Sequence, residues 1–300
     1  NMKVDLCGVT LNNPVMTASG TFGSGAEYAE FVDLNKLGAV VTKGVANVPW
    51  PGNPTPRVAE VYGGMLNAVG LQNPGIDLFV ERDIPFLKQF DTKIMVNVCG
   101  HSTEEYIEVV ERLRDQPVDL LEINISCPNV KEGGIAFGQD PKAVEAITKE
   151  MKKHAAQPVI MKLSPNVTDI TEMARAAEAG GADGLSLINT ITGMKIDINR
   201  QKFVLANKTG GMSGPAIHPV AVRMVYQTAQ AVSIPIVGMG GIMNAEDAIE
   251  MILAGATAVS VGTANFTNPH VTEEIVAGIR DYMERYQVAD IRDLVGAVHE

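Results

Sequence analysis

The sequence predicts an α/β fold, a (β/α)8 TIM barrel that occupies residues 1–300 as a single domain. Short β-branched apolar runs alternate with amphipathic helical stretches, which is typical of a parallel sheet. Eight such runs occur in 300 residues, and a barrel of this kind needs roughly 250 residues. An open doubly wound sheet is the alternative, but the first strand and turn lack the G-x-G-x-x-G dinucleotide motif.

The first element expected is a β-hairpin over residues 4–11, turning at Cys7 and Gly8 and closing one end of the barrel. The eight barrel strands are expected near residues 15–17, 39–42, 94–98, 120–124, 159–162, 184–188, 236–238 and 258–261. Helical patterns lie between them at residues 103–114, 141–154, 168–179, 219–231 and 245–254. Asp169, Thr171 and Asn244 stand where helix N-caps are expected. Gly180-Gly181 and Gly255 stand where helices should end.

Two long connections exceed what a minimal barrel needs. Residues 44–92 are rich in proline, and residues 191–217 are rich in glycine and asparagine. Both follow barrel strands, so we expect these insertions to lie over the C-terminal face, where barrel active sites are built.

Composition excludes several classes of function. The net charge is −11 and no basic run is present, which argues against nucleic acid or an anionic membrane as a partner. The three cysteines are widely spaced and odd in number, so neither a disulfide framework nor a metal site is expected. No apolar stretch has the length of a membrane span, and we expect a soluble, cytoplasmic protein.

Cys127 is the strongest candidate for a catalytic group. It follows the apolar run at residues 118–123 and precedes a glycine-rich stretch at residues 130–138 that could serve as a lid. A thiol at this junction, flanked by Asn124 and Asn129, suits site chemistry better than core packing. The competing interpretation is a small buried hydrophobic side chain, the commonest role of a free cysteine.

The other strand ends bring lysines, amides and glycines to the same rim. Lys43 and Lys162 each end a strand, where a lysine needs an anion, a carbonyl or a flavin ring as partner unless its side chain reaches solvent. Asn97, Asn124, Asn129 and Asn189 offer paired donors and acceptors for a planar amide or imide, although any one could be an ordinary loop amide. Glycines follow the last two strands at Gly240-Gly241 and Gly262-Thr263. They predict a phosphate site, with simple turn glycines as the alternative.

These residues resemble a known family. The segment Asn124-Ile125-Ser126-Cys127-Pro128-Asn129 is similar to the active-site segment of class 1 dihydroorotate dehydrogenases. Further similar segments occur along nearly the whole chain, at residues 18–20, 42–44, 67–75, 162–166 and 210–214. The stretch from Cys127 to Gly134 resembles the 1B subclass more than the fumarate-using 1A subclass.

The resemblance implies an FMN enzyme that oxidises (S)-dihydroorotate to orotate in pyrimidine (UMP) biosynthesis. Cys127 would remove the C5 proton while hydride passes from C6 to flavin N5, with Lys43 close to both flavin and substrate. The positions that match substrate contacts are Lys43, Asn67, Ala68, Val69, Gly70, Leu71, Asn124, Asn129, Asn189 and Thr190. The positions that match FMN contacts are Ser19, Lys43, Gly44, Asn97, Asn124, Lys162, Ile188, Gly214, Gly240, Gly241, Gly262 and Thr263.

The resemblance also implies a partner. The sequence has no visible nicotinamide or iron–sulfur motif, so transfer of electrons to NAD would need a second subunit carrying FAD and a [2Fe–2S] cluster. We expect a heterotetramer with two copies of each chain. The chain begins at the expected hairpin, without the membrane-associating extension of the quinone-linked class 2 enzymes, and those enzymes use serine at the position of Cys127.

Two other functions stay open from the sequence. A dihydropyrimidine dehydrogenase domain shares the barrel, the FMN and a cysteine, but its uracil-type substrates lack the carboxylate that Lys43 and the Asn67 segment would hold. A non-catalytic barrel that binds a phosphate metabolite would tolerate Cys127→Ala with no measurable change.

Overall fold

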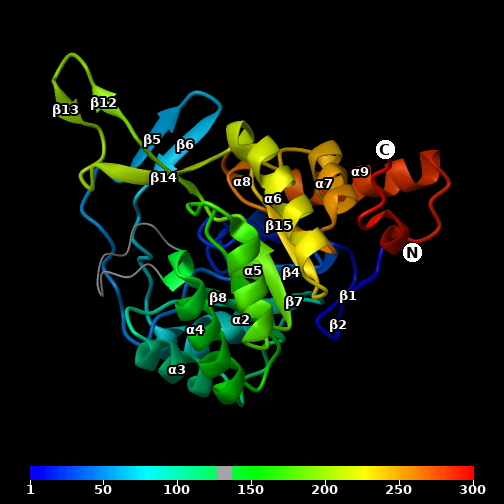
Figure 1. Ribbon diagram of the computed structural model, residues 1–300, viewed down its shortest axis with the longest axis horizontal. Coiled ribbons are helices and arrows are strands. Elements are labelled where there is room, and N and C mark those ends of the chain that lie inside the picture. Colours follow the sequence, from blue (N-terminus) through cyan, green and yellow to red (C-terminus); the bar gives the residue numbers. More distant parts are fainter. Residues whose placement is uncertain (127–136) are drawn as a thin grey trace.

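The predicted barrel is confirmed by the computed structural model, which describes residues 1–126 and 137–300. Eight parallel strands close in the order β10-β15-β16-β3-β4-β7-β8-β9 (Figure 1). They are β3 (Val15–Thr17), β4 (Ala39–Val41), β7 (Lys93–Val98), β8 (Leu120–Asn124), β9 (Val159–Lys162), β10 (Gly184–Leu187), β15 (Ile236–Met239) and β16 (Ala258–Val261). All eight coincide with the runs predicted from the sequence, because a strand buried on both faces needs a continuous apolar run.

Helices surround the barrel, but not after every strand. They are α1 (Ile76–Leu78), α2 (Ile84–Leu87), α3 (Thr103–Arg112), α4 (Pro141–His154), α5 (Ile170–Ala179), α6 (His218–Ala231), α7 (Ala245–Ala254), α8 (Ala264–Thr267) and α9 (Val271–Arg285). The side chains of Asp169 and Asn244 cap α5 and α7 as predicted, whereas Thr171 lies inside α5 and is not its cap. Between β3 and β4 the described chain forms only two 3-10 turns, so a strict alternation of eight strands and eight helices is wrong for the first unit.

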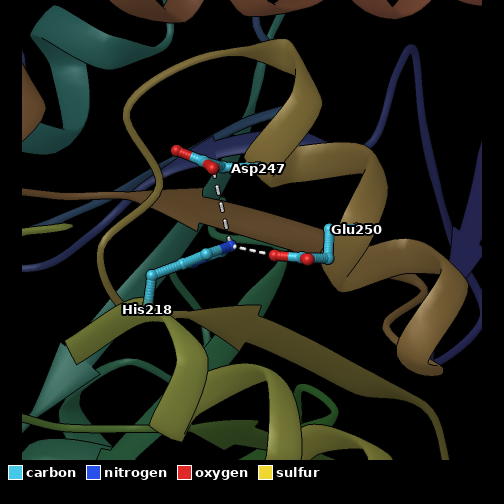
Figure 2. A group of neighbouring side chains, drawn as sticks. All are labelled: His218, Asp247 and Glu250. Carbon is cyan, nitrogen blue, oxygen red and sulfur yellow. Dashed lines mark hydrogen bonds and ion pairs between the residues drawn. The ribbon is translucent and has the colours of Figure 1, made fainter. Parts of the chain in front are cut away.

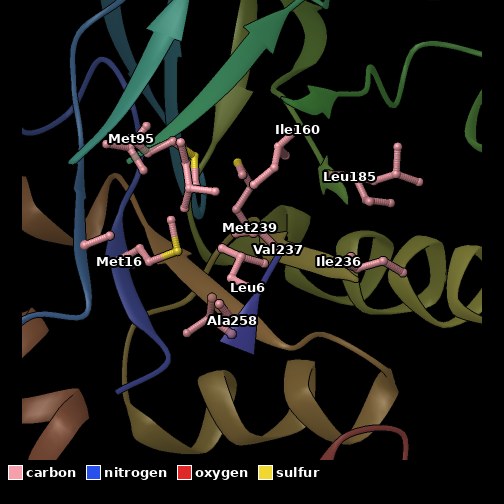
Figure 3. Packing of buried hydrophobic residues seen from close by; sticks show 14 of the residues in the cluster. Leu6, Met16, Met95, Ile160, Leu185, Ile236, Val237, Met239 and Ala258 are labelled. Carbon is pink, nitrogen blue, oxygen red and sulfur yellow. The ribbon is translucent and has the colours of Figure 1, made fainter. Parts of the chain in front are cut away.

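The N-terminal hairpin closes the bottom of the barrel. Its strands β1 (Val4–Leu6) and β2 (Val9–Leu11) pair antiparallel around Cys7 and Gly8, both of which have positive φ. Such a turn matches the twist of a two-residue hairpin. Leu6 is fully buried and lies among Met16 and Val237 of the barrel core (Figure 3).

Replacing Leu6 by alanine should therefore cost about 2–5 kcal/mol of unfolding free energy, because the barrel end cannot collapse onto the cavity. Urea unfolding measures this. Thr10→Ala, at an exposed position of the same hairpin, is the control and should change the stability by less than about 0.5 kcal/mol. Equal small effects of the two substitutions would show that the hairpin does not close the core.

The two long insertions form a second sheet that the sequence did not predict. Its strands are β5 (Val58–Val61), β6 (Gly64–Asn67), β11 (Ile191–Met194) and β14 (Thr209–Ser213), in the order β11-β14-β6-β5. A small hairpin, β12 (Ile196–Asp197) and β13 (Lys202–Phe203), extends beyond it (Figure 1). The pairing of β14 with β6 joins segments that are far apart in the chain, and this ties the insertions together over the C-terminal ends of the barrel strands.

Candidate active site

A cavity of about 230 Å³ opens at the C-terminal ends of the barrel strands. Every barrel strand except β7 contributes lining residues from its end or from the loop that follows, and the insertion sheet contributes the rest. The predicted site residues that line it are Ser19, Lys43, Gly44, Asn67, Val69, Gly70, Leu71, Asn124, Lys162, Ile188, Asn189, Thr190, Gly214, Gly240, Gly241, Gly262 and Thr263. The rim of the barrel and the insertion sheet thus bring residues from most of the chain together around one cavity.

Two lysines give the cavity a positive charge. Lys162 is only 4% exposed, and its Nζ donates to Ser19 Oγ at 3.1 Å. Lys43 is half-buried, and burial lowers the pKa of its ammonium group, with a smaller contribution from Arg57. In the described part of the chain no carboxylate forms an ion pair with either lysine. Because buried cations require a counter-charge, the cavity is suited to an anionic ligand.

An amide cluster lies on the same rim, where Asn124 at the end of β8 pairs in register with Lys162 at the end of β9. Asn124 Oδ1 accepts from the backbone N–H of Ser126 at 3.3 Å and from Ser126 Oγ at 3.1 Å. Asn189 Nδ2 donates to Ser126 Oγ at 2.7 Å. Ser126 therefore joins the two carboxamides and fixes their orientation, a role that its place in the Cys127 segment did not reveal.

The loops after β15 and β16 present free backbone donors. Gly240 and Gly241 have positive φ, and a Cβ on Gly241 would lie 2.7 Å from the Gly214 carbonyl oxygen. The backbone N–H groups of Gly241, Ile242 and Thr263 donate to no acceptor among residues 1–126 and 137–300. Clustered free N–H groups at strand–helix junctions are the usual binding site for phosphate.

Gly262 differs from the other glycines. Its φ is ordinary, and a Cβ built there would meet no protein atom closer than 3.4 Å. Neither the backbone nor the protein packing requires glycine at this position. Since Gly262 lines the cavity, the missing side chain leaves room for a ligand.

Two predicted residues lie behind the cavity wall. Ala68 is fully buried, and so is Asn97, whose Nδ2 donates to Glu122 Oε1 at 2.7 Å. Asn97 Oδ1 has no partner and lies 3.2 Å from where a Cβ on Gly44 would stand. Asn97 therefore supports the wall formed by Gly44 and does not line the cavity directly.

Cys127 and Asn129 lie outside the described residues. Cys127 is the next residue after Ser126 in the chain, and Ser126 is hydrogen-bonded to the two amides of the rim. Two further site residues, Ser213 and Ser260, were not predicted from the sequence. Ser213 Oγ accepts from Thr263 Oγ1 at 2.6 Å, and the buried Ser260 Oγ has no partner among the described residues. Both line the cavity. The alternation of the strands could have identified Ser260 as an inward-pointing residue.

Comparison with known proteins decides the family. The family model described as dihydroorotate dehydrogenase matches residues 1–283. The chain belongs to the dihydroorotate dehydrogenase family. Two relatives are each described as dihydroorotate dehydrogenase B (NAD(+)), catalytic subunit. The protein of Lachnoclostridium phytofermentans is 72% identical over 298 residues, covering 99% of each chain. That of Alkaliphilus metalliredigens is 65% identical over 298 residues, again covering 99% of each.

A solved structure of a dihydroorotate dehydrogenase from Eimeria tenella, in complex with ferulenol, shares the fold. Its TM-score is 0.83 at 22% sequence identity, over 99% of this chain and 88% of that one. The predicted resemblance to the class 1B dihydroorotate dehydrogenases is confirmed by the relatives, whose names carry the B designation. No helix in the part of the chain described here combines the length and the apolar character needed to cross a membrane.

The cavity of this dihydroorotate dehydrogenase family member fits the FMN that the family implies. The free N–H groups after β15 and β16 suit its phosphate, and Lys162 supplies positive charge for the electron-rich edge of the ring. Gly262 leaves space where any side chain would intrude.

Gly262→Val should fill the space beside residue 262 in the cavity without lowering the stability of the protein. We expect FMN affinity to fall about a hundredfold, because the added methyl groups enter the cavity and overpacking is costly. The flavin-free protein should keep its melting temperature, since the protein around Gly262 has room for a Cβ. Flavin titration followed by fluorescence measures the affinity. Unchanged affinity in a folded variant would place the cofactor elsewhere.

Proposed function

We propose that this chain is the FMN-binding catalytic subunit of a class 1B dihydroorotate dehydrogenase, which oxidises (S)-dihydroorotate to orotate. The observation that carries the proposal is the union, in one cavity, of free N–H groups, unpaired lysines and an amide cluster that directly precedes Cys127. The names of the relatives support the same activity and NAD as the electron acceptor.

Bound FMN would supply the acceptor for the hydride from C6 of the substrate. The chain supplies the proton chemistry, with Cys127 as the general base that takes the C5 proton. General base catalysis of this kind contributes about 10²–10⁴-fold to the rate. A free thiol has a pKa of about 8.5, so the thiolate must form before the proton is removed.

The substrate is held by its carboxylate and by its ring amides. Lys43 supplies positive charge for the carboxylate, because it is half-buried and forms no ion pair within the described residues. The carboxamides of Asn124 and Asn189, oriented by Ser126, suit the planar imide of the ring. The remaining substrate contacts proposed are Asn67, Val69, Gly70, Leu71, Asn129 and Thr190, with Ala68 supporting this segment from behind the cavity wall.

The cofactor is held at the other side of the cavity. Gly240, Gly241, Gly262 and Thr263 would hold the phosphate, and the Gly214 carbonyl oxygen lies close behind Gly241. The remaining cofactor residues proposed are Ser19, Lys43, Gly44, Asn124, Lys162 and Ile188, which would hold the ring, and Asn97, which would support it from behind Gly44.

Electrons reach NAD through a second subunit. The sequence contains three cysteines, Cys7, Cys99 and Cys127, which are too few for a [2Fe–2S] cluster with four thiolate ligands. The relatives are named catalytic subunits, which supports a separate electron-transfer subunit. We propose that this partner carries FAD and a [2Fe–2S] cluster, and that two copies of each chain form a cytoplasmic heterotetramer.

A dye-linked assay tests the proposal without the partner. The chain should oxidise dihydroorotate at least about a hundredfold faster than dihydrouracil, which lacks the carboxylate, because unpaired buried charge rejects the neutral analogue. Lys43→Met should remove most of this preference, whereas Lys36→Met, at an exposed lysine, should keep it. Preferential oxidation of dihydrouracil would instead indicate a dihydropyrimidine dehydrogenase activity.

A further inference from the structure

His218 lies directly behind the loop of residues 240–243, at the start of α6. The side chain is buried, with 7% of the residue exposed. The close approach of the loop to His218 depends on Gly241, because a Cβ there would stand 2.7 Å from His218 Cβ and 2.9 Å from the His218 backbone nitrogen. The loop that lines the cavity therefore packs directly against His218, so a substitution of His218 should alter the position of the loop.

Both ring nitrogens of His218 face hydrogen-bond acceptors. Nδ1 lies 2.8 Å from the carbonyl oxygen of Gly240, and Nε2 lies 2.8 Å from Glu250 Oε1 and 3.7 Å from Asp247 Oδ1 (Figure 2). A carbonyl oxygen and a carboxylate only accept, so each nitrogen must donate a proton to make its bond. The ring satisfies both bonds only as the imidazolium cation.

The same cluster holds the other end of the loop. Asp247 Oδ2 accepts from the backbone N–H of Met243 at 2.9 Å. The carbonyl of Gly240 is thus fixed by His218, and the N–H of Met243 is fixed by Asp247. The N–H groups of Gly241 and Ile242 lie between these two anchors and have no acceptor among the described residues.

The charges of the cluster also matter for an anion in the cavity. Asp247 and Glu250 are three residues apart on α7, so their carboxylates repel each other and would repel a phosphate bound at the loop. The His218 ring, with both nitrogens donating, places its charge beside both carboxylates and the Gly240 carbonyl, where it offsets the negative charge.

We propose that His218 is a positioning residue, which holds residues 240–243 in the conformation that binds the FMN phosphate and neutralises the two carboxylates behind them. The inference rests on the proposed function, because it takes the phosphate of FMN as the group bound at this loop. His218 does not line the cavity and acts only through Gly240 and the charge balance.

Comparison of FMN with riboflavin, which lacks the phosphate, separates this role from a general effect on the fold. The ratio of the FMN affinity to the riboflavin affinity is measured by titrating each flavin into the flavin-free full chain. In His218→Gln the ratio should fall about tenfold, because one charge-assisted hydrogen bond and one counter-charge are lost. His218→Lys, which restores a cationic donor, should return the ratio to within about twofold of the original.

His154 provides a matched control. It is the last residue of α4, its Nδ1 lies 2.7 Å from Glu111 Oε1, and it does not line the cavity. His154→Gln should leave the ratio unchanged. An unchanged ratio in His218→Gln, an equal loss of both flavins, or a failure of His218→Lys to restore the ratio would each overturn the inference. A starting protein with no preference for FMN over riboflavin would instead contradict the proposed phosphate site.

Discussion

Cys127→Ala is expected to leave a yellow protein whose flavin is reduced by dihydroorotate about 10²–10⁴-fold more slowly than in the unchanged chain. The variant removes the only group proposed to take the C5 proton, whereas the residues proposed to bind FMN are untouched. Affinity for FMN should therefore stay the same. Stopped-flow measurement of flavin bleaching without oxygen gives the rate constant directly.

Two controls make this result specific. Cys99→Ala replaces a fully buried thiol outside the cavity lining and should leave the reduction rate within a factor of about three. Cys127→Ser should retain part of the activity, at higher pH than the thiol requires, because a hydroxyl is a weaker acid. Rapid bleaching in Cys127→Ala would show that another group removes the proton.

Lys162→Met is expected to separate cofactor binding from stability. The Lys162 residue is 4% exposed. Its ammonium group donates a hydrogen bond to Ser19 and forms no ion pair within residues 1–126 and 137–300. Removing it should weaken FMN binding about tenfold to a hundredfold, the loss of one buried charge-assisted contact. The flavin-free protein should become more stable, because a buried unpaired cation is replaced by an apolar side chain of similar length.

Thermal melting of the flavin-free protein and flavin titration measure the two effects. Lys36→Met serves as the control, since that exposed lysine pairs only with Glu273 across 3.9 Å and should change neither quantity. A Lys162→Met protein that is less stable without flavin would mean that the lysine has a structural partner, and its proposed role toward the cofactor would then be wrong.

Barrel strands and the N-terminal hairpin could be predicted because their signals are local. An apolar run such as that of β9 is buried on both faces, and the Cys7-Gly8 turn requires two residues that accept positive φ. The insertion sheet could not be predicted in this way. Its strands β6 and β14 pair across a long stretch of chain, and neither strand has the alternation of a half-buried strand.

Part of the site could be predicted because several of its residues lie at the ends of barrel strands. Lys162 and Asn124 end barrel strands and Lys43 closely follows one, and the ends of parallel strands converge whatever the connections between them. His218 begins α6, and its hydrogen-bond partners lie on α7 and on the loop after β15. No pattern in the sequence links these three segments. Packing between elements decides contacts of that kind.

Anaerobic addition of dihydroorotate to the purified, flavin-loaded chain tests the central claim most directly. We expect rapid loss of the flavin absorbance and formation of one orotate per flavin, without any partner subunit. A yellow protein that stays yellow would contradict the assignment of dihydroorotate as substrate, and a chain that cannot be loaded with FMN would contradict the flavoenzyme itself.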